Sequence, residues 1–306
     1  MPRDTRIVVV SGPTGAGKTR IAIELAKKLG GELVGADSVQ VYRGFDIGSS
    51  KPTAAELAGL PHHLIDVREA DDPLDAAHYA ELADAAIADI GGRGRLPIVV
   101  GGTGLWLRAL LRGLVELPAV DGALRAELEA EWDREGAAAM HRRLEELDPI
   151  SARNIHVNDK LRVVRALEVQ RQTGRPLGLL RQEHALGAPR YQDFSVIIDI
   201  DRTQLAQRVQ ARTRAMLEAG LVEEVRGIVA RSGAEVRALQ SVGYKQALHH
   251  VIDGVSLEET EFRINQATLV YARRQRTWWR NEPGVAMRVP PEAVGIQDAV
   301  LRFLGQ

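Results

Sequence analysis

Apolar and polar positions along the first part of the chain predict strands that alternate with helices. The runs 7–10 and 98–100 are short, continuous and mostly β-branched, which is typical of strands buried on both faces. Apolar residues with helical spacing follow the first run over 18–29 and recur over 75–90, where Gly91-Gly92 is expected to end the helix. Strands that alternate with helices form a parallel sheet, with the site at the carboxyl ends of its strands.

The pattern changes near residue 116. Residues 116–190 show helical stretches at 122–146 and 158–173 and no strand, before an apolar run at 195–200 resumes the sheet. Shorter strands are predicted at 32–36 and 63–65. We therefore predict an α/β core formed by 1–115 and 191–306, with 116–190 inserted as a helical domain.

The first predicted strand runs directly into a phosphate-binding motif. The motif reads G-x-x-x-x-G-K-T and comprises Gly12, Pro13, Thr14, Gly15, Ala16, Gly17, Lys18 and Thr19. Its glycines let backbone amides approach a polyphosphate, and the following helix directs its positive end at the same anion. Lys18 is expected to neutralise phosphate charge, and the Thr19 hydroxyl to help hold Mg²⁺. The fold class is thus an α/β P-loop parallel-sheet core. Kinases, NTPases and transferases with a diphosphate leaving group all use such a loop.

Composition limits the class of protein. The chain has 306 residues, of which 45% are hydrophobic and 26% charged, the balance of an ordinary globular protein. The absence of cysteine excludes disulfides, thiolate metal sites and cysteine nucleophiles. No apolar run approaches the roughly 20 residues of a membrane helix, and the first strand starts too early for a signal peptide. We expect a cytoplasmic monomer that does not contact membranes.

Charge is unevenly distributed although its net value is −1. Residues 116–135 carry seven acids against two arginines, whereas 141–190 have a net charge of +4. Residues 262–280 carry five arginines and no acid, interleaved with aromatic residues. Basic residues among aromatics suit a nucleic-acid surface. The alternative is a solvated helix face whose aromatic side chains point into the core.

Polar residues follow the predicted strand 32–36. Asp37 could accept a proton from a group held over the P-loop, or it could cap the next turn. The Gln40 amide could read the edge of a base, because it both donates and accepts. Asp37, the P-loop and Thr103 all lie just beyond strand ends, so they should converge in space.

Two other patterns favour structural roles. The pair His62-His63 lacks the spacing of a metal site, since adjacent strand residues face opposite ways. The apolar run before Asp199 resembles the strand that completes a Mg²⁺ site in many P-loop NTPases. We prefer the interpretation that Asp199 or Asp201 caps the next helix.

Three arginines follow on that helix, at positions 208, 212 and 214. Arg208 and Arg212 are four residues apart and share a face. One of them could stabilise charge on a departing diphosphate. Ion pairs with Glu218 or Glu223 are the alternative, and we expect them for at least one of the three.

This ordered set of motifs resembles the tRNA dimethylallyltransferases, also called tRNA isopentenyltransferases. The resemblance extends through most of the chain and is carried by Gly12–Thr19, Asp37–Arg43, Asp46–Gly48, Lys51-Pro52, Pro61–Asp66, Gly101–Gly104, Arg162–Glu168, Thr173-Gly174, Val242–Tyr244 and Ala272–Trp278. It implies transfer of the dimethylallyl group of dimethylallyl diphosphate to N6 of the adenosine 3′-adjacent to the anticodon, with release of diphosphate.

The resemblance also implies roles for individual residues. The P-loop would hold the isoprenoid diphosphate with Mg²⁺ at Thr19, Asp37 would be the general base, Thr103 would lie near the reacting centre, and Arg212 would steady the leaving group. The helical insertion would clasp the anticodon stem-loop. The implied tRNA-binding residues are Asp37, Ser38, Val39, Gln40, Leu161, Arg162, Val163, Val164, Arg165, Gln240, Ser241, Val242, Gly243, Tyr244 and Lys245. The family often has Gln in place of Leu161, and Arg in place of Gln240 and Lys245.

Two other classes of function use the same features. A nucleoside or small-molecule kinase would pass a phosphoryl group over the P-loop, with Asp37 as the base on a hydroxyl. A nucleotide-dependent RNA-binding protein would use the loop as a switch and would tolerate the loss of Asp37.

Overall fold

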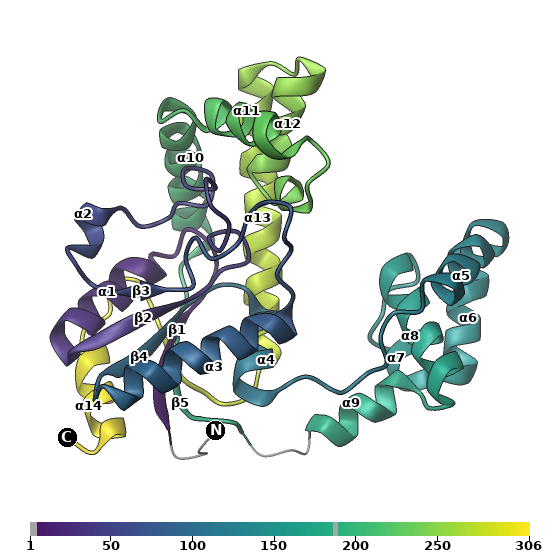
Figure 1. Ribbon diagram of the computed structural model, residues 1–306, viewed down its shortest axis with the longest axis horizontal. Coiled ribbons are helices and arrows are strands. Elements are labelled where there is room, and N and C mark those ends of the chain that lie inside the picture. The colour runs from purple at the N-terminus through teal and green to yellow at the C-terminus, as the bar shows by residue number, and fades with distance from the viewer. Residues whose placement is uncertain (1–4, 186–188) are drawn as a thin grey trace. The chain divides into compact units, whose positions relative to one another are not determined.

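The computed structural model describes residues 5–185 and 189–306, which form two compact units (Figure 1). We call Met1–Leu111 with Arg190–Gln306 the core unit, and Arg112–Pro189 the helical unit. The helical unit thus interrupts the sequence of the core unit. The first segment of the core unit ends at residue 111, where the sequence suggested 115, and the helical unit ends at 189, where the sequence suggested 190.

The core unit is built on one six-stranded sheet in which every neighbouring pair is parallel. The strand order is β3-β2-β4-β1-β5-β6. The strands are β1 (Arg6–Ser11), β2 (Gly31–Ala36), β3 (His62–His63), β4 (Leu96–Gly101), β5 (Gln192–Ile198) and β6 (Val285–Val289). The sequence did not predict β6, and β5 lies earlier than the expected 195–200. The prediction of a parallel α/β sheet is confirmed.

The central strands end in register. Ser11 pairs with both Gly101 and Ile197, and Ala36 pairs with Gly101. The segments that follow β1, β2 and β4 therefore leave the sheet at one edge. These are the segments that carry the P-loop, Asp37 and Thr103.

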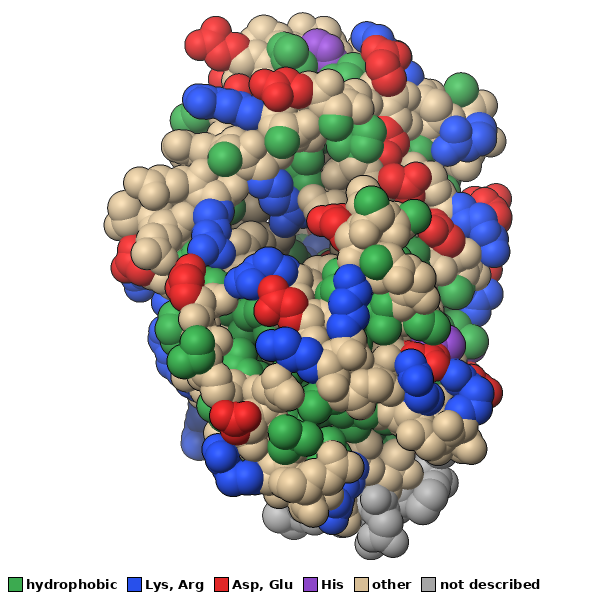
Figure 2. Space-filling view, turned by 90° about the vertical axis from the view of Figure 1, so that its left-hand side faces the viewer, with side chains coloured by type: hydrophobic (Ala, Val, Ile, Leu, Met, Phe, Trp, Pro, Cys, Tyr) green, Lys and Arg blue, Asp and Glu red, His purple; other side chains and the backbone are tan. Residues whose placement is uncertain are grey.

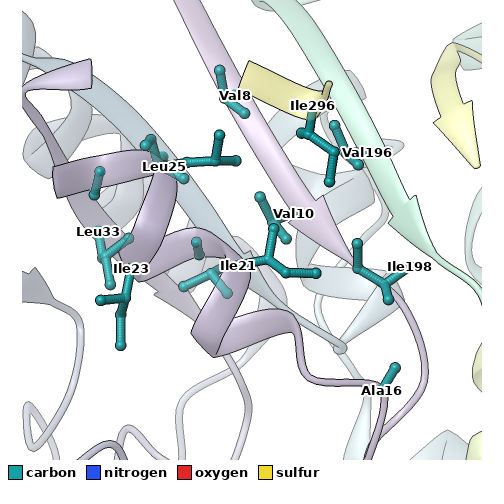
Figure 3. Close-up of a cluster of buried hydrophobic side chains, with 14 of the residues drawn as sticks. Val8, Val10, Ala16, Ile21, Ile23, Leu25, Leu33, Val196, Ile198 and Ile296 are labelled. Carbon is teal, nitrogen blue, oxygen red and sulfur yellow. The ribbon is translucent and has the colours of Figure 1, made fainter. Parts of the chain in front are cut away.

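The core lies between the sheet and the helix that follows the P-loop. Helix α1 (Lys18–Leu29) presents Ile21 and Leu25 to Val8 and Val10 of β1, all of them buried (Figure 3). The alternate residues of the same strand face the other side of the sheet and are also buried. Both faces are covered, which explains why these strands read as continuous apolar runs.

The remaining helices of the core unit flank the sheet and extend beyond it. They are α2 (Ala54–Leu57), α3 (Ala76–Gly92), α4 (Gly104–Arg112), α10 (Arg202–Glu218), α11 (Leu221–Ser232), the 3₁₀ helix η1 (Arg237–Gln240), α12 (Tyr244–Asp253), α13 (Leu257–Asn281) and α14 (Ile296–Leu304). Helix α3 includes Gly91 and Gly92 and ends at Gly92, so the expectation that this glycine pair ends the helix is confirmed. Among the described residues, no helix is long and apolar enough to cross a membrane.

The helical unit contains no strand in its described part. Its helices are α5 (Gly122–Glu135), α6 (Ala137–Leu147), α7 (Pro149–Ala152), α8 (Lys160–Thr173) and α9 (Leu177–Ala185). The predicted helix 122–146 is two helices, because Gly136 adopts a φ of 83° that breaks the helical path. Leu128, Met140, Leu144 and Leu167 join α5, α6 and α8 in a separate hydrophobic core.

Candidate active site

The P-loop takes a conformation that requires its glycines. Gly12 has a φ of 146°, and a Cβ there would lie 2.4 Å from the carbonyl oxygen of Ile198. Gly17 has a φ of 86° and caps α1 without a side-chain hydrogen bond. The first amides of α1 therefore have no partner within the helix and are available to an anion.

Two cations lie at this loop. The Lys18 ammonium donates to the carbonyl of Pro13 at 2.9 Å, and the Arg212 guanidinium donates to the Thr14 hydroxyl at 2.7 Å. Burial lowers the pKa of Lys18 to about 8, with the charge of Asp37 opposing the shift and that of Arg212 adding to it. Burial also lowers the pKa of Arg212, against the opposing charge of Asp37.

Neither cation forms an ion pair with a carboxylate among the described residues. Their positive charge is therefore held in a partly buried place without a paired anion, which is costly unless a ligand supplies one. Figure 2 shows a hollow in the face that is turned to the left in Figure 1, with Lys and Arg side chains along its margin. The loop is arranged to receive an anion.

Two other arginines of α10 form ion pairs. Arg208 pairs with Glu292 at 2.8 Å, and Arg214 pairs with Glu261 at 2.9 Å. The partners predicted from the sequence, Glu218 and Glu223, are thus wrong. Arg208 and Arg214 thus form ion pairs, as the alternative predicted, while Arg212 bonds to the P-loop. Arg208 also lies near this loop, because its Nη1 is 3.8 Å from the position that a Cβ would take at Gly17.

Asp37 and Thr103 meet at the sheet edge, as the strand ends predicted. One oxygen of Asp37, Oδ1, accepts from the amides of Val39 at 2.9 Å and Gln40 at 3.3 Å. The Thr103 hydroxyl accepts from the amide of Ser38 at 3.0 Å. Asp37 does cap the turn, but it uses one oxygen only. In the described part of the chain, Oδ2 has no hydrogen-bond partner and can accept a proton.

Helix α13 adds two residues to which the sequence assigned no role. The Gln275 side chain accepts from the amide of Thr14 at 2.8 Å and donates to the carbonyl of Gly102 at 2.9 Å. Tyr271 lies one turn earlier, and burial followed by the charge of Asp37 raises the pKa of its hydroxyl to about 12. The signals available in the sequence were the motif Ala272–Trp278, which contains Gln275, and the spacing of four that places Tyr271 and Gln275 on one helix face.

The rest of α13 has features of both structures expected for its arginines and aromatic residues: a nucleic-acid surface, and a helix whose aromatic side chains point into the core. Trp279 is buried in the core, whereas Phe262 is 57% exposed. Arg263 pairs with Glu259 at 2.6 Å. The aromatic side chains therefore divide between the interior and the surface.

The segment after Asp37 is braced from inside the core unit. The Gln40 amide donates to the carbonyl of Ser49 at 3.0 Å. Glu224 accepts from the amide of Ile47 at 2.7 Å and from the Tyr244 hydroxyl at 2.6 Å. Tyr244 is fully buried, so its side chain supports this loop and does not face solvent, contrary to its expected place on an RNA surface.

The other expected RNA-binding residues divide in the same way. In the helical unit, Leu161 is 78% exposed and Arg162 is exposed, whereas Val163 and Val164 are buried in the core of the unit. Arg165 donates to the carbonyl of Pro118 at 2.8 Å. The side chains of the two valines cannot contact RNA in this conformation.

The corresponding segment of the core unit shows the same division. Gln240 and Lys245 are exposed, Ser241 and Val242 are half-buried, and Gly243 is buried. The exposed residues at the two ends of the segment remain available to a partner.

The basic character of 141–190 is largely neutralised within the helical unit. Glu131 of α5 pairs with Arg143 of α6 and, at 3.0 Å, with Arg171 of α8. Lys160 pairs with Asp133 at 2.5 Å. The acidic stretch 116–135 thus binds the helices that follow it, which the separate charge counts did not reveal.

Asp201 is the cap of α10, as we preferred. It accepts from the amide of Thr203 at 2.7 Å, and its backbone hydrogen bonds lower its pKa. Asp199 instead pairs with Arg276 at 3.0 Å. The described residues contain no cluster of three or more His, Cys, Asp or Glu side chains that could hold a metal by themselves.

The histidine pair has the structural role that we predicted. His63 Nε2 lies 2.8 Å from a carboxylate oxygen of Glu32, which is nearly buried. The hydrogen bond from Arg93 is the main reason that the pKa of Glu32 falls to about 2. Burial lowers the pKa of His62 to about 4.

Fold and site together define a P-loop α/β protein in which a phosphate loop, a carboxylate and a hydroxyl meet at one sheet edge. The family model described as IPP transferase matches residues 40–282. The chain therefore belongs to the IPP transferase family, and it is a transferase that modifies tRNA.

Relatives and solved structures agree with this assignment. The tRNA dimethylallyltransferase of Anaeromyxobacter dehalogenans (strain 2CP-C) is 50% identical over 94% of this chain and 95% of its own. The tRNA delta(2)-isopentenylpyrophosphate transferase of Staphylococcus epidermidis has a TM-score of 0.71 and 30% identity, over 99% of both chains. A eukaryotic dimethylallyltransferase described as acting on tRNA has a TM-score of 0.75 and 27% identity, over 90% of this chain and 70% of its own.

Proposed function

We propose that this transferase moves the dimethylallyl group of dimethylallyl diphosphate to N6 of the adenosine 3′-adjacent to the tRNA anticodon. One observation carries the proposal. The carboxylate of Asp37 shares a sheet edge with Lys18 and Arg212, two cations that have no carboxylate partner among the described residues. A base and a receptor for a departing anion are thus side by side, as displacement of diphosphate requires.

The reaction balances with these groups. The N6 lone pair forms a bond to C1 of the dimethylallyl group while the bond from C1 to the diphosphate oxygen breaks. Oδ2 of Asp37 accepts the proton that N6 loses, which helps because that lone pair is delocalised into the adenine ring. Lys18, Arg212 and the first amides of α1 stabilise the charge that develops on diphosphate. Thr103, held against the amide of Ser38, borders the reacting centre.

Mg²⁺ is the cofactor that fits this arrangement. The Thr19 hydroxyl, in the first turn of α1, is the one protein ligand that we assign to it, and diphosphate oxygens and water would complete its shell. When bound, the ion neutralises charge on the leaving group.

The RNA substrate would reach the site by leaving its own stack. An adenine inside an anticodon loop must swing out before its N6 can approach Asp37. We assign RNA contacts to the exposed side chains among the expected residues, namely Leu161, Arg162, Gln240 and Lys245. Buried Val163, Val164 and Tyr244 would shape these surfaces from beneath.

The test supplies purified protein with Mg²⁺, radiolabelled dimethylallyl diphosphate and an unmodified anticodon stem-loop. We expect label in the RNA without ATP, and a loss of at least ~100-fold in kcat for Asp37→Asn. Asparagine keeps the oxygen that caps the turn but removes the base, so the fold and RNA binding should persist. Asp37→Ala, which also loses the cap, should be less stable than Asp37→Asn.

Two results would contradict the proposal. Transfer by Asp37→Asn at the wild-type rate would remove Asp37 from the role of base. Absence of transfer by wild type, together with steady ATP turnover and phosphorylation of a nucleoside, would replace the transferase with a kinase.

A further inference from the structure

Gln275 connects two loops of the site through a single buried side chain. It is 7% exposed, and its amide uses both ends: Oε1 accepts from the amide of Thr14, and Nε2 donates to the carbonyl of Gly102. A Cβ at position 102 would lie 2.3 Å from Nε2, so only glycine permits this approach. The fit requires a side chain that donates at one end and accepts at the other.

The connection divides the P-loop into two halves. In the first half, Pro13 has no N–H and the N–H of Thr14 is bound to Gln275. The Pro13 carbonyl accepts from the amide of Ala16 at 3.2 Å and from the ammonium of Lys18. The protein itself therefore fixes the first half of the loop, while the half that starts α1 retains free amides for an anion.

The same side chain lies beside the reacting centre. Gly102 precedes Thr103, whose hydroxyl accepts from Ser38 beside Asp37. Tyr271, one turn from Gln275 on α13, interacts through its hydroxyl with the side chains of both Gln275 and Thr103. A shift of Gln275 would therefore move the diphosphate loop and the Thr103 loop relative to each other.

We propose that Gln275 is a positioning residue that holds the leaving-group loop and the reacting centre in one geometry. The inference rests on the proposed function, since it assigns the P-loop to the diphosphate of the isoprenoid. Misplacement of reacting groups by a fraction of an ångström to one ångström is enough to slow catalysis strongly. Gln275 itself touches neither substrate in this scheme, because both ends of its amide are bound to backbone.

Two substitutions separate positioning from simple structural support. Gln275→Leu removes both hydrogen bonds, and we expect a ~10-fold rise in the KM for dimethylallyl diphosphate and a ~10-fold fall in kcat. The KM for the stem-loop should change less than ~2-fold. Gln275→Glu should behave similarly at pH 8, because a carboxylate cannot donate to the carbonyl of Gly102.

The pH profile of Gln275→Glu is the sharper readout. A protonated glutamic acid donates and accepts as glutamine does, so the KM ratio of this variant to wild type should return toward one as the pH falls from 8 through the pKa of the introduced carboxyl, whose ordinary value is about 4.3. Gln275→Leu should show no such recovery. Thr260→Val is the matched control, because Thr260 is a fully buried polar residue of the same helix whose hydroxyl, within the described residues, bonds only to the carbonyl of Ser256.

Inorganic diphosphate binding, measured by calorimetry, keeps this test independent of transfer. If wild type transferred nothing, the proposed function would fail, yet weaker diphosphate binding by Gln275→Leu than by Thr260→Val would still support the positioning role. The inference is overturned if both Gln275 variants match wild type in diphosphate binding and kcat. It is equally overturned if they lose RNA and diphosphate affinity together, with a lowered Tm and no recovery at low pH.

Discussion

Positive charge is used in opposite ways in the two units of this protein. In the core unit, Lys18 and Arg212 lie partly buried at the P-loop and donate to a carbonyl and a hydroxyl. In the helical unit, Arg125 and Arg165 pair with the buried carboxylate of Glu168. The first arrangement leaves charge for a ligand to neutralise, whereas the second uses charge to join helices.

Whether a cation has a carboxylate partner therefore distinguishes a binding site from a structural contact, a distinction that the sequence does not show because both contain basic residues. A buried cation without a carboxylate is unfavourable unless a ligand completes it, and such groups gather at functional sites. A cation already paired with an acid offers little to a partner. The stretch 141–190 is basic by sequence, but its ion pairs leave less free charge than its composition implies.

The largest effect is expected at Lys18. Lys18→Met should weaken inorganic diphosphate binding by ~100-fold or more, because it removes a charge-assisted contact in a partly buried site. Calorimetry on the free protein measures this directly. Binding within a few-fold of wild type would show that the loop does not receive the anion.

The pKa of Lys18 predicts the direction in which diphosphate affinity changes with pH. Because its pKa is about 8 in the free protein, Lys18 is charged below pH 8 and increasingly neutral above it. Diphosphate affinity should therefore fall as the pH rises through 8, and this step should be absent from Lys18→Met.

Arg212 and Arg208 form the next test, because they share a face of α10 and differ in their partners. Arg212→Met should lower kcat by ~100-fold, since its guanidinium is directed at the P-loop. Arg208→Met should change kcat less than ~2-fold, because Arg208 pairs with Glu292. Equal losses of kcat for the two variants in steady-state assays would contradict this prediction, because the ion pair of Arg208 would then make no difference to its role.

Glu168 tests the structural use of charge. Glu168→Gln should reduce the free energy of unfolding of the helical unit by about 2 kcal/mol, because it leaves two arginines without their buried partner. Glu127→Gln, which alters an exposed pair with Arg171, should stay within about 0.5 kcal/mol. Urea titration followed by circular dichroism and hydrogen exchange of α5 and α8 measures both.

The pH dependence of this stability follows from the direction of the shift. Burial opposes ionisation of Glu168, but the hydrogen bonds from Arg125 and Arg165 outweigh it and lower the pKa of this carboxyl. The stabilisation is complete above the ordinary value of 4.5 and is lost as the pH falls toward the lower pKa of the folded state. Glu168→Gln should abolish that acid-dependent step.

The smallest effect is expected at the RNA surface. Arg162→Ala should raise the KM for the stem-loop about 3-fold and reduce the slope of log affinity against log salt by roughly one. Arg162 itself pairs with Asp159 at 3.2 Å, but its side chain is 72% exposed, whereas Arg175 pairs with Glu183 at 2.6 Å and is 48% exposed. Arg175→Ala is therefore the control and should leave both quantities unchanged. An unchanged salt slope for Arg162→Ala would assign the contact to another residue.

Much of the core was predictable because its signals are local. The helix 18–29 was placed correctly to the residue, since glycine, lysine and apolar spacing all act within one turn. The meeting of Asp37 and Thr103 followed from strand ends in a parallel sheet. The break at Gly136 and the strand β6 were missed, because a helix-compatible neighbourhood hides the first and a short, half-exposed run hides the second.

The sequence by itself determined the P-loop, the parallel sheet and, through its ordered motifs, the family. Those features depend on residues that are neighbours along the chain or on one element. Only the tertiary structure decided that Arg212 faces Thr14 while Arg208 does not, that Tyr244 is buried, and that Gln275 joins two loops. Each of those side chains bonds to a residue more than 80 positions away, which for Tyr244 is Ser49. No local periodicity specifies which distant group will satisfy a buried charge or amide.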